Sequence, residues 1–95
     1  MKYVITCMTY SMGIQIDDPD VLEVCSSKRA ADKVMNLIRE KCLSKGWTVS
    51  PVEPDYYRRR TSITADTGMV LYKFSSYERM ENVKWGYFPY LESDK

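Results

Sequence analysis

Apolar and β-favouring residues alternate on both sides of the opening stretch, residues 2–10 (KYVITCMTY). This composition is typical of a strand in the middle of a sheet, with neighbours along both edges and another layer over one face. Residues 14–16 continue the extended pattern and lead into residues 17–20 (DDPD), where aspartate and proline favour a tight loop. We therefore expect the first hairpin to turn at residues 17–20, ahead of a second strand over residues 21–25.

An amphipathic helix is predicted after this second strand. Ser26 and Ser27 suit its N-terminus, because a serine oxygen accepts hydrogen bonds from the free amides of the first helical turn, and Gly46 supplies the left-handed stop. Apolar residues repeat at helical spacing and form one stripe, which two more positions widen: Ala31, Val34, Met35, Ile38 and Cys42, with Ala30 and Leu37. We expect this stripe to be the face that packs on the sheet.

Prolines interrupt the extended stretch that follows the helix. Trp47, Val49 and Val52 resume an extended pattern, but Pro51 and Pro54 cannot donate hydrogen bonds to a strand ladder. This third strand is therefore predicted to be an edge strand or an irregular one.

Two alternating stretches then predict a hairpin over residues 56–65 and 69–74, with a three-residue turn at residues 66–68 (DTG). Ser75 and Glu78 match the spacing of a capping box, which makes residues 76–82 a candidate short helix. The aromatic tail, residues 84–91 (KWGYFPYL), is a candidate last strand. The prediction is one α+β domain over residues 1–95, with a mostly antiparallel β-β-α-β-β sheet and one main amphipathic helix packed on one face.

The composition excludes most catalytic chemistry. A chain of 95 residues leaves little room for an enclosed active site. It contains no histidine, which removes the commonest general base and the Ser–His and Cys–His nucleophile arrangements. The isolated glycines do not form a phosphate-binding loop, and the scattered cysteines do not form a four-ligand zinc site. We expect a protein that is not an enzyme and binds no cofactor and no metal.

Charge and cysteine content indicate the compartment. The formal net charge of +1 gives no general attraction to nucleic acid or to a membrane. The N-terminus lacks the apolar core of a signal peptide, and no stretch approaches the about 20 apolar residues of a membrane helix. Cys7, Cys25 and Cys42 are odd in number and contain no C-x-x-C pair, so they are predicted to be small buried apolar side chains in the cytoplasm.

One cluster has the residue types of a binding site. It consists of Tyr56, Tyr57, Arg58, Arg59 and Arg60, with Lys73 across the predicted hairpin. Arginine and tyrosine are enriched at protein interface hot spots, and both also bind nucleic acids through phosphate contacts and base stacking. A protein partner is the first hypothesis and nucleic acid the alternative. A run of arginines is also typical of a solvated strand face that protects an edge, and the aromatic tail suits either the core or homo-oligomer contacts.

The start MKYVIT, the segment VLEVCSSKRAADKVMNLI and the tyrosine-rich hairpin resemble a layout common among short phage and mobile-element accessory proteins, including anti-CRISPR and other anti-defence proteins. The resemblance covers residues 1 to about 49 as an order of elements. It implies a non-catalytic inhibitor that blocks a surface of a larger host nucleic-acid-processing complex. SSKRAADKVMNLI also resembles the lysine-rich helix of double-stranded-RNA-binding domains, although those domains open with a helix and close with this one.

Overall fold

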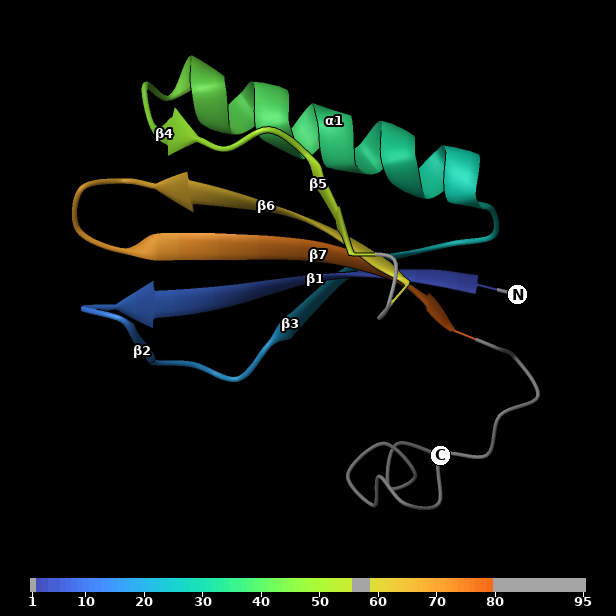
Figure 1. Ribbon diagram of the computed structural model, residues 1–95, viewed down its shortest axis with the longest axis horizontal. Coiled ribbons are helices and arrows are strands. Elements are labelled where there is room, and N and C mark those ends of the chain that lie inside the picture. The colour runs from blue at the N-terminus through green and yellow to red at the C-terminus, as the bar shows by residue number, and fades with distance from the viewer. Residues whose placement is uncertain (1, 56–58, 80–95) are drawn as a thin grey trace.

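The computed structural model describes residues 2–55 and 59–79, which form one antiparallel sheet of seven strands with a helix packed against it (Figure 1). Strand β1 (Lys2–Ser11) lies in the middle of the sheet, as its composition predicts. It pairs with β7 (Leu71–Arg79) along one edge, and with β2 (Ile14–Gln15) and β3 (Asp20–Cys25) along the other. The predicted α+β class is confirmed.

The far side of the sheet is short and irregular. Strand β6 (Arg60–Asp66) pairs with β7, and its other edge carries β4 (Thr48–Val49) and β5 (Glu53–Asp55). Between β4 and β5, the Ser50 N–H donates to Thr64 O at 2.9 Å, and Ser50 Oγ accepts from Thr64 N at 3.0 Å. The predicted irregular edge is confirmed, and a serine side chain takes over one ladder bond where proline follows.

Helix α1 (Lys28–Ser44) begins and ends close to where the sequence predicts. Ser27 is the N-cap, and its Oγ accepts from Ala30 N at 3.1 Å. At the other end Gly46 has a φ of 79°, the left-handed conformation expected after a helix. The helix contacts β1, β3, β4, β6 and β7, so it lies across one face of the sheet. No helix within the described ranges is long and apolar enough to span a membrane.

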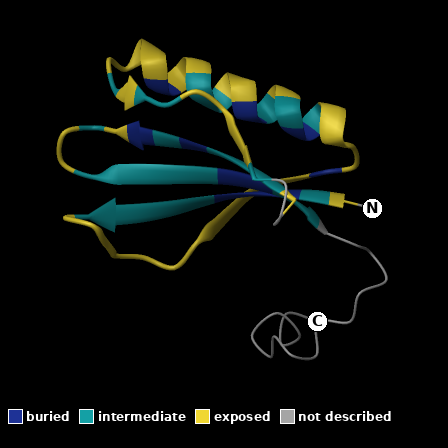
Figure 2. Ribbon diagram, viewed as in Figure 1, coloured by how far each residue is buried: buried dark blue, intermediate teal, exposed yellow. Residues whose placement is uncertain are grey.

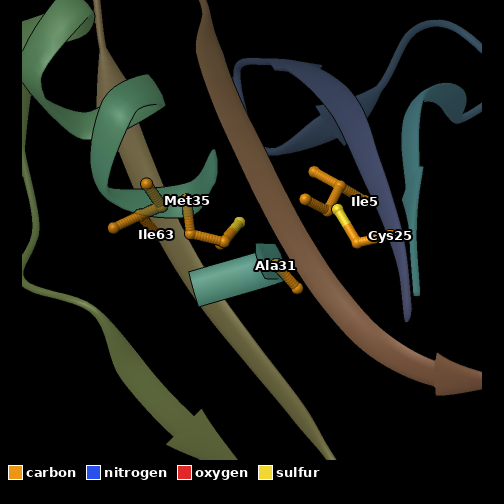
Figure 3. Close-up of a cluster of buried hydrophobic side chains, with 5 residues drawn as sticks. All are labelled: Ile5, Cys25, Ala31, Met35 and Ile63. Atoms are coloured by element: carbon orange, nitrogen blue, oxygen red, sulfur yellow. The ribbon is translucent and has the colours of Figure 1, made fainter. Parts of the chain in front are cut away.

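The core lies between this helix and the sheet. Figure 3 shows its buried members, which are Ile5, Cys25, Ala31, Met35 and Ile63. Half-buried side chains pack around them, namely Tyr3, Ala30, Val34, Ile38 and Phe74. The predicted stripe is therefore the packed face, with one correction: Leu37 is 52% exposed. It follows Met35 by two residues, or about 200° around the helix, and so points away from the sheet.

The first hairpin turns earlier than predicted. Ser11 pairs with Ile14, so the loop consists of Met12 and Gly13, with φ values of 53° and 79°. Two positive φ angles define the two-residue turn whose twist matches that of the flanking strands, and this geometry is favourable for glycine. Residues 17–19 are instead part of an exposed connection between β2 and β3, and the chain returns to the same edge of β1 at Asp20, where β3 begins.

The prediction of a short helix at residues 76–82 is wrong for residues 76–79. Strand β7 continues to Arg79, and Ser76 pairs with Ile5 on one side and Thr61 on the other. Pairing along both edges outweighs the local capping-box signal of Ser75 and Glu78. Residues 80–82 and the predicted strand over residues 84–91 lie outside the described residues.

The hairpin between β6 and β7 turns where predicted, with a longer loop. Asp66 pairs with Leu71, so residues 67–70 form the connection. Asp66 Oδ1 accepts from Gly68 N at 2.8 Å, and Gly68 has a φ of 92°. The aspartate and the glycine therefore have the roles that the sequence suggests, one as an acceptor and the other as the residue with positive φ.

Candidate functional site

The structure describes half of the predicted binding cluster. Tyr56, Tyr57 and Arg58 lie outside the described residues, whereas Arg59, Arg60 and Lys73 lie within them. Arg60 begins β6 and Arg59 directly precedes it, beside the end of β7 and near the N-terminus of α1. Lys73 lies elsewhere on the sheet.

Arg59 stands at a bend just before β6. Its φ of 51° is unusual for a residue other than glycine. Its carbonyl oxygen accepts from Glu78 N at 3.4 Å, and its Nη1 lies 3.8 Å from Glu78 Oε2. The Arg59 side chain is 72% exposed, so this ion pair is weak and leaves the guanidinium accessible to a partner.

Arg60 is held by its neighbours on the sheet. It pairs with Tyr77 on β7 and Asp55 on β5, which places the three side chains in one row on the face opposite α1. Its Cζ lies 5.6 Å from the centre of the Tyr77 ring, within the range of a cation–π interaction. Its Nε is buried without a hydrogen-bond partner in the described part of the chain. The contact with the ring and the burial of Nε both restrict the Arg60 side chain.

We call Arg59, Arg60, Tyr77 and Glu78 the arginine corner. Side chains alternate between the two faces of a strand, so Glu78 lies on the helix side and Tyr77 on the opposite side. The two arginines follow these partners and diverge around the corner of the sheet. Arg59 and Arg60 therefore do not share one face of the sheet, which strand alternation also predicts for consecutive residues.

Lys73 does not join the arginine corner. It pairs with Thr64, four positions along β6 from Arg60, or about 13 Å at the rise of an extended strand. It shares the sheet face of Arg60 and lines a different hollow, of about 600 Å³, together with Glu53 and Asp66. The expected contact across the hairpin is therefore absent, because the Arg60 partner is Tyr77.

A hollow of about 360 Å³ lies beside the arginine corner, at the N-terminus of α1. Its charged lining consists of three cations, Lys28, Arg59 and Arg60, and three carboxylates, Asp32, Asp55 and Glu78. Lys28 Nζ lies 2.9 Å from Asp32 Oδ2. Because the charges balance, the hollow has no net attraction for a polyanion. It suits a partner that also carries charges of both signs.

The helix face with Lys28, Arg29, Lys33 and Arg39 is also less basic than its sequence suggests. Lys28 pairs with Asp32, as above. Arg39 Nε donates to Ser50 O at 3.1 Å, which ties the helix to the irregular edge of the sheet. Arg39 therefore has a structural contact, and Arg29 and Lys33 remain as exposed cations on this face.

The three cysteines are poorly suited to nucleophilic or metal chemistry. Cys7, Cys25 and Cys42 are free, and burial raises the pKa of each thiol above its ordinary value. At neutral pH they are therefore protonated and weak nucleophiles. No group of three or more histidine, cysteine or acidic side chains that could hold a metal ion occurs among residues 2–55 and 59–79.

Sequence reasoning missed Tyr77 and Glu78, which position the two arginines. The capping-box match assigned them to a helix. The apolar–polar alternation of residues 72–74 breaks at Ser75 and Ser76, so the sequence pattern gave no clear signal that the strand continues to Glu78. Ser75 and Ser76 are 2% and 3% exposed, so short hydroxyl side chains here pack as core residues.

Comparisons with known proteins identify no relative. No protein-family model, no curated protein and no solved structure matches the chain. The geometry of the site is therefore the basis for any functional conclusion.

Proposed function

We propose that this chain is a small, non-catalytic protein-binding module whose contact surface includes the arginine corner. In line with the resemblance in element order, its partner would be a host nucleic-acid-processing complex in the cytoplasm. The chain would act as a phage-type inhibitor that blocks a surface of that complex. It would need no cofactor or metal for this role.

The pairing of Arg60 with Tyr77 is the observation that carries the proposal. A guanidinium held 5.6 Å from a ring centre loses less conformational freedom on binding than a free side chain does. The neighbouring Arg59 is 72% exposed and can change partner at little cost, because its ion pair with Glu78 is long. Arginine and tyrosine are also the residue types that contribute most at interface hot spots.

A protein partner fits this corner better than nucleic acid does. Binding to a phosphate backbone depends on an excess of cations that displace counterions. The hollow beside the corner instead has three carboxylates among its charged residues, as many as its cations. Nucleic-acid binding through the basic, tyrosine-rich hairpin remains the alternative, and it makes a different prediction for the effect of salt.

The proposal is tested by affinity capture from a bacterial host lysate, followed by binding measurements with the purified partner. Arg59→Ala/Arg60→Ala should weaken binding at least about tenfold, as loss of hot-spot arginines does. Arg29→Ala/Lys33→Ala is the matched control, because it removes two exposed cations from the helix and should leave affinity unchanged. Arg60→Lys keeps the charge but loses the planar guanidinium, and should fall between these two variants.

Two outcomes would count against the proposal. One is equal affinity of the wild type and Arg59→Ala/Arg60→Ala for the captured partner. The other is binding of labelled single- or double-stranded DNA or RNA with an affinity that falls linearly with salt on logarithmic axes, which would favour the nucleic-acid alternative. Inhibition itself is tested by adding the chain to the purified partner and measuring whether that partner still binds its own nucleic acid.

A further inference from the structure

A second surface of the sheet has the properties of a peptide-binding edge. Of the ten exposed large apolar residues in the described part of the chain, six lie in β2, β3 and their connections: Met12, Ile14, Ile16, Val21, Leu22 and Val24. Figure 2 shows this region as an almost continuous exposed segment below β1. Contiguous exposed apolar residues on a small domain mark interaction sites more often than isolated ones do.

The backbone of β3 is open on one side. Within the described residues β3 pairs with β1 alone, and its outer edge has no neighbour. Alternate residues of such a strand point N–H and C=O groups away from the sheet, where an extended chain can pair with them. A register shift between Ile5 and Thr6 bends β3 near Leu22, but the strand is assigned over the whole of Asp20–Cys25.

Charge identifies the kind of chain that would pair there. Between Lys2 and Lys28 the sequence contains no lysine or arginine and four acidic residues, Asp17, Asp18, Asp20 and Glu23. These four side chains belong to exposed residues. We call the exposed residues from Met12 to Val24 the acidic apolar edge.

We propose that the acidic apolar edge binds an extended protein segment in which basic and apolar residues alternate, added to the sheet as a strand beside β3. The register gives the reason for alternation. Val24 pairs with Val4 and Val21 with Thr6 on the face opposite α1, whereas Glu23 pairs with Ile5 on the helix side. A strand beside β3 therefore meets apolar groups on one face and a carboxylate on the other, so its own side chains should alternate in the same way.

Other occupants fit less well. A second copy paired along β3 would bring two sets of four carboxylates together with no lysine or arginine in the same stretch to offset them. Nucleic acid would be repelled by the same charges. The acidic apolar edge shares no residue with the arginine corner, and β1 lies between them, so the proposal goes beyond the proposed function and does not depend on it.

The test uses a fluorescein-labelled peptide of about eight residues with alternating lysine and valine, long enough to form one strand. Binding is measured by anisotropy at low salt, and protection of β3 amides by hydrogen exchange. Three control peptides separate the contributions to binding. One has the same composition with lysines and valines in two blocks, one has alternate backbone amides methylated, and one has glutamate in place of lysine.

We expect the alternating lysine–valine peptide to bind and to protect amides within residues 21–25. The block, methylated and glutamate peptides should each bind at least about tenfold more weakly. Glu23→Lys should weaken binding of the lysine–valine peptide about tenfold, because an attractive cross-strand pair becomes a repulsive one. Arg59→Ala/Arg60→Ala should bind this peptide as the wild type does, which separates this proposal from the proposed function.

The proposal would be overturned if the block or methylated peptide bound as tightly as the alternating lysine–valine peptide, since binding would then not require an added strand. Absence of peptide binding, or binding without protection of β3, would also overturn it. Sedimentation tests whether a second copy of the chain is the occupant. If the wild type is a dimer and Asp20→Lys or Glu23→Lys changes its dimerisation, the edge serves a second copy instead.

Discussion

The two edges of the sheet differ in how they meet solvent. On one side β4 and β5 are short, residues 50–52 with Pro51 separate them, and Pro54 lies within β5. On the other side β3 presents Val21, Leu22 and Val24 to solvent.

Proline and strand breaks are common means of protecting an edge from unwanted pairing. The other side also has a strand break and a proline, Pro19, but both lie between β2 and β3, so β3 itself is not interrupted by proline. The two edges of one sheet thus differ in how much uninterrupted backbone they offer to an added strand, which is why the proposed peptide site lies at β3.

The largest expected effect comes from a core substitution in β6, the strand that carries β4 and β5. Ile63 lies on β6, is 1% exposed and packs in the core beneath the helix. Ile63→Ala should lower the free energy of unfolding by about 2 to 5 kcal/mol, since it removes buried methyl groups and leaves a cavity. Urea or thermal denaturation measures the loss.

The exposed edge provides the control for this change. Val24→Ala removes a comparable apolar side chain that is 48% exposed, and should cost only about 0.5 kcal/mol. If Ile63→Ala does not fold, Ile63→Val should still show a loss of about 0.5 to 1.5 kcal/mol. Equal losses for Ile63→Ala and Val24→Ala would contradict the difference in packing between the two sides.

A smaller effect is expected where the proline-interrupted edge is attached to β6. Ser50 Oγ accepts from Thr64 N at 3.0 Å. Ser50→Ala should lower the free energy of unfolding by about 1 to 2 kcal/mol, because it leaves a half-buried amide without its acceptor.

Ser44→Ala is the matched control, because its hydroxyl donates to Lys41 O at an exposed position. Hydrogen exchange provides a second measurement: the Thr64 amide should exchange faster in Ser50→Ala than in the wild type. Unchanged exchange at Thr64 would show that Ser50 does not anchor this edge.

The smallest effect is a stabilisation of the β2–β3 side. Met12 has a φ of 53° in the two-residue turn between β1 and β2, and asparagine tolerates this conformation better than methionine. Met12→Asn should therefore raise the free energy of unfolding by about 0.5 to 1 kcal/mol. Gly13→Ala should have the opposite effect, because Gly13 also has a positive φ. A stabilising Gly13→Ala would show that the turn adopts another geometry.

Much of the fold could be predicted because local signals agreed with the final packing. Ser27, the stripe from Ala31 to Cys42, and Gly46 define a helix through capping, spacing and backbone freedom, all of which act within a few residues. The alternation of residues 60–66 likewise gives the correct faces of β6. These predictions needed no knowledge of which segments meet.

The errors arose where strand pairing decided between local alternatives. Ser75 and Glu78 satisfy a capping box, yet pairing with β1 and β6 makes them part of a strand. Residues 17–20 have turn-forming residues, yet the pairing of Ser11 with Ile14 moves the hairpin to Met12 and Gly13. In both places several ladder hydrogen bonds compete with one local motif, and the ladder prevails.

The candidate site was predicted in part. Arg59 and Arg60 were chosen for their residue types, and the structure places both beside one hollow. Lys73 was placed with them by the expected hairpin, but the register aligns it with Thr64. Sequence alone does not fix strand register, and a shift along the partner strand changes every cross-strand neighbour.

By itself, the sequence determined the helix, the central strand, the irregular proline edge and the residue types of the proposed binding surface, because each depends on the chemistry of neighbouring residues. Tertiary structure decided the length of β7, the partners of Arg59 and Arg60, and the exposure of the acidic apolar edge. These features depend on the pairing of β1 with β7. That pairing sets which edge of the sheet stays open and which face of the sheet each arginine occupies.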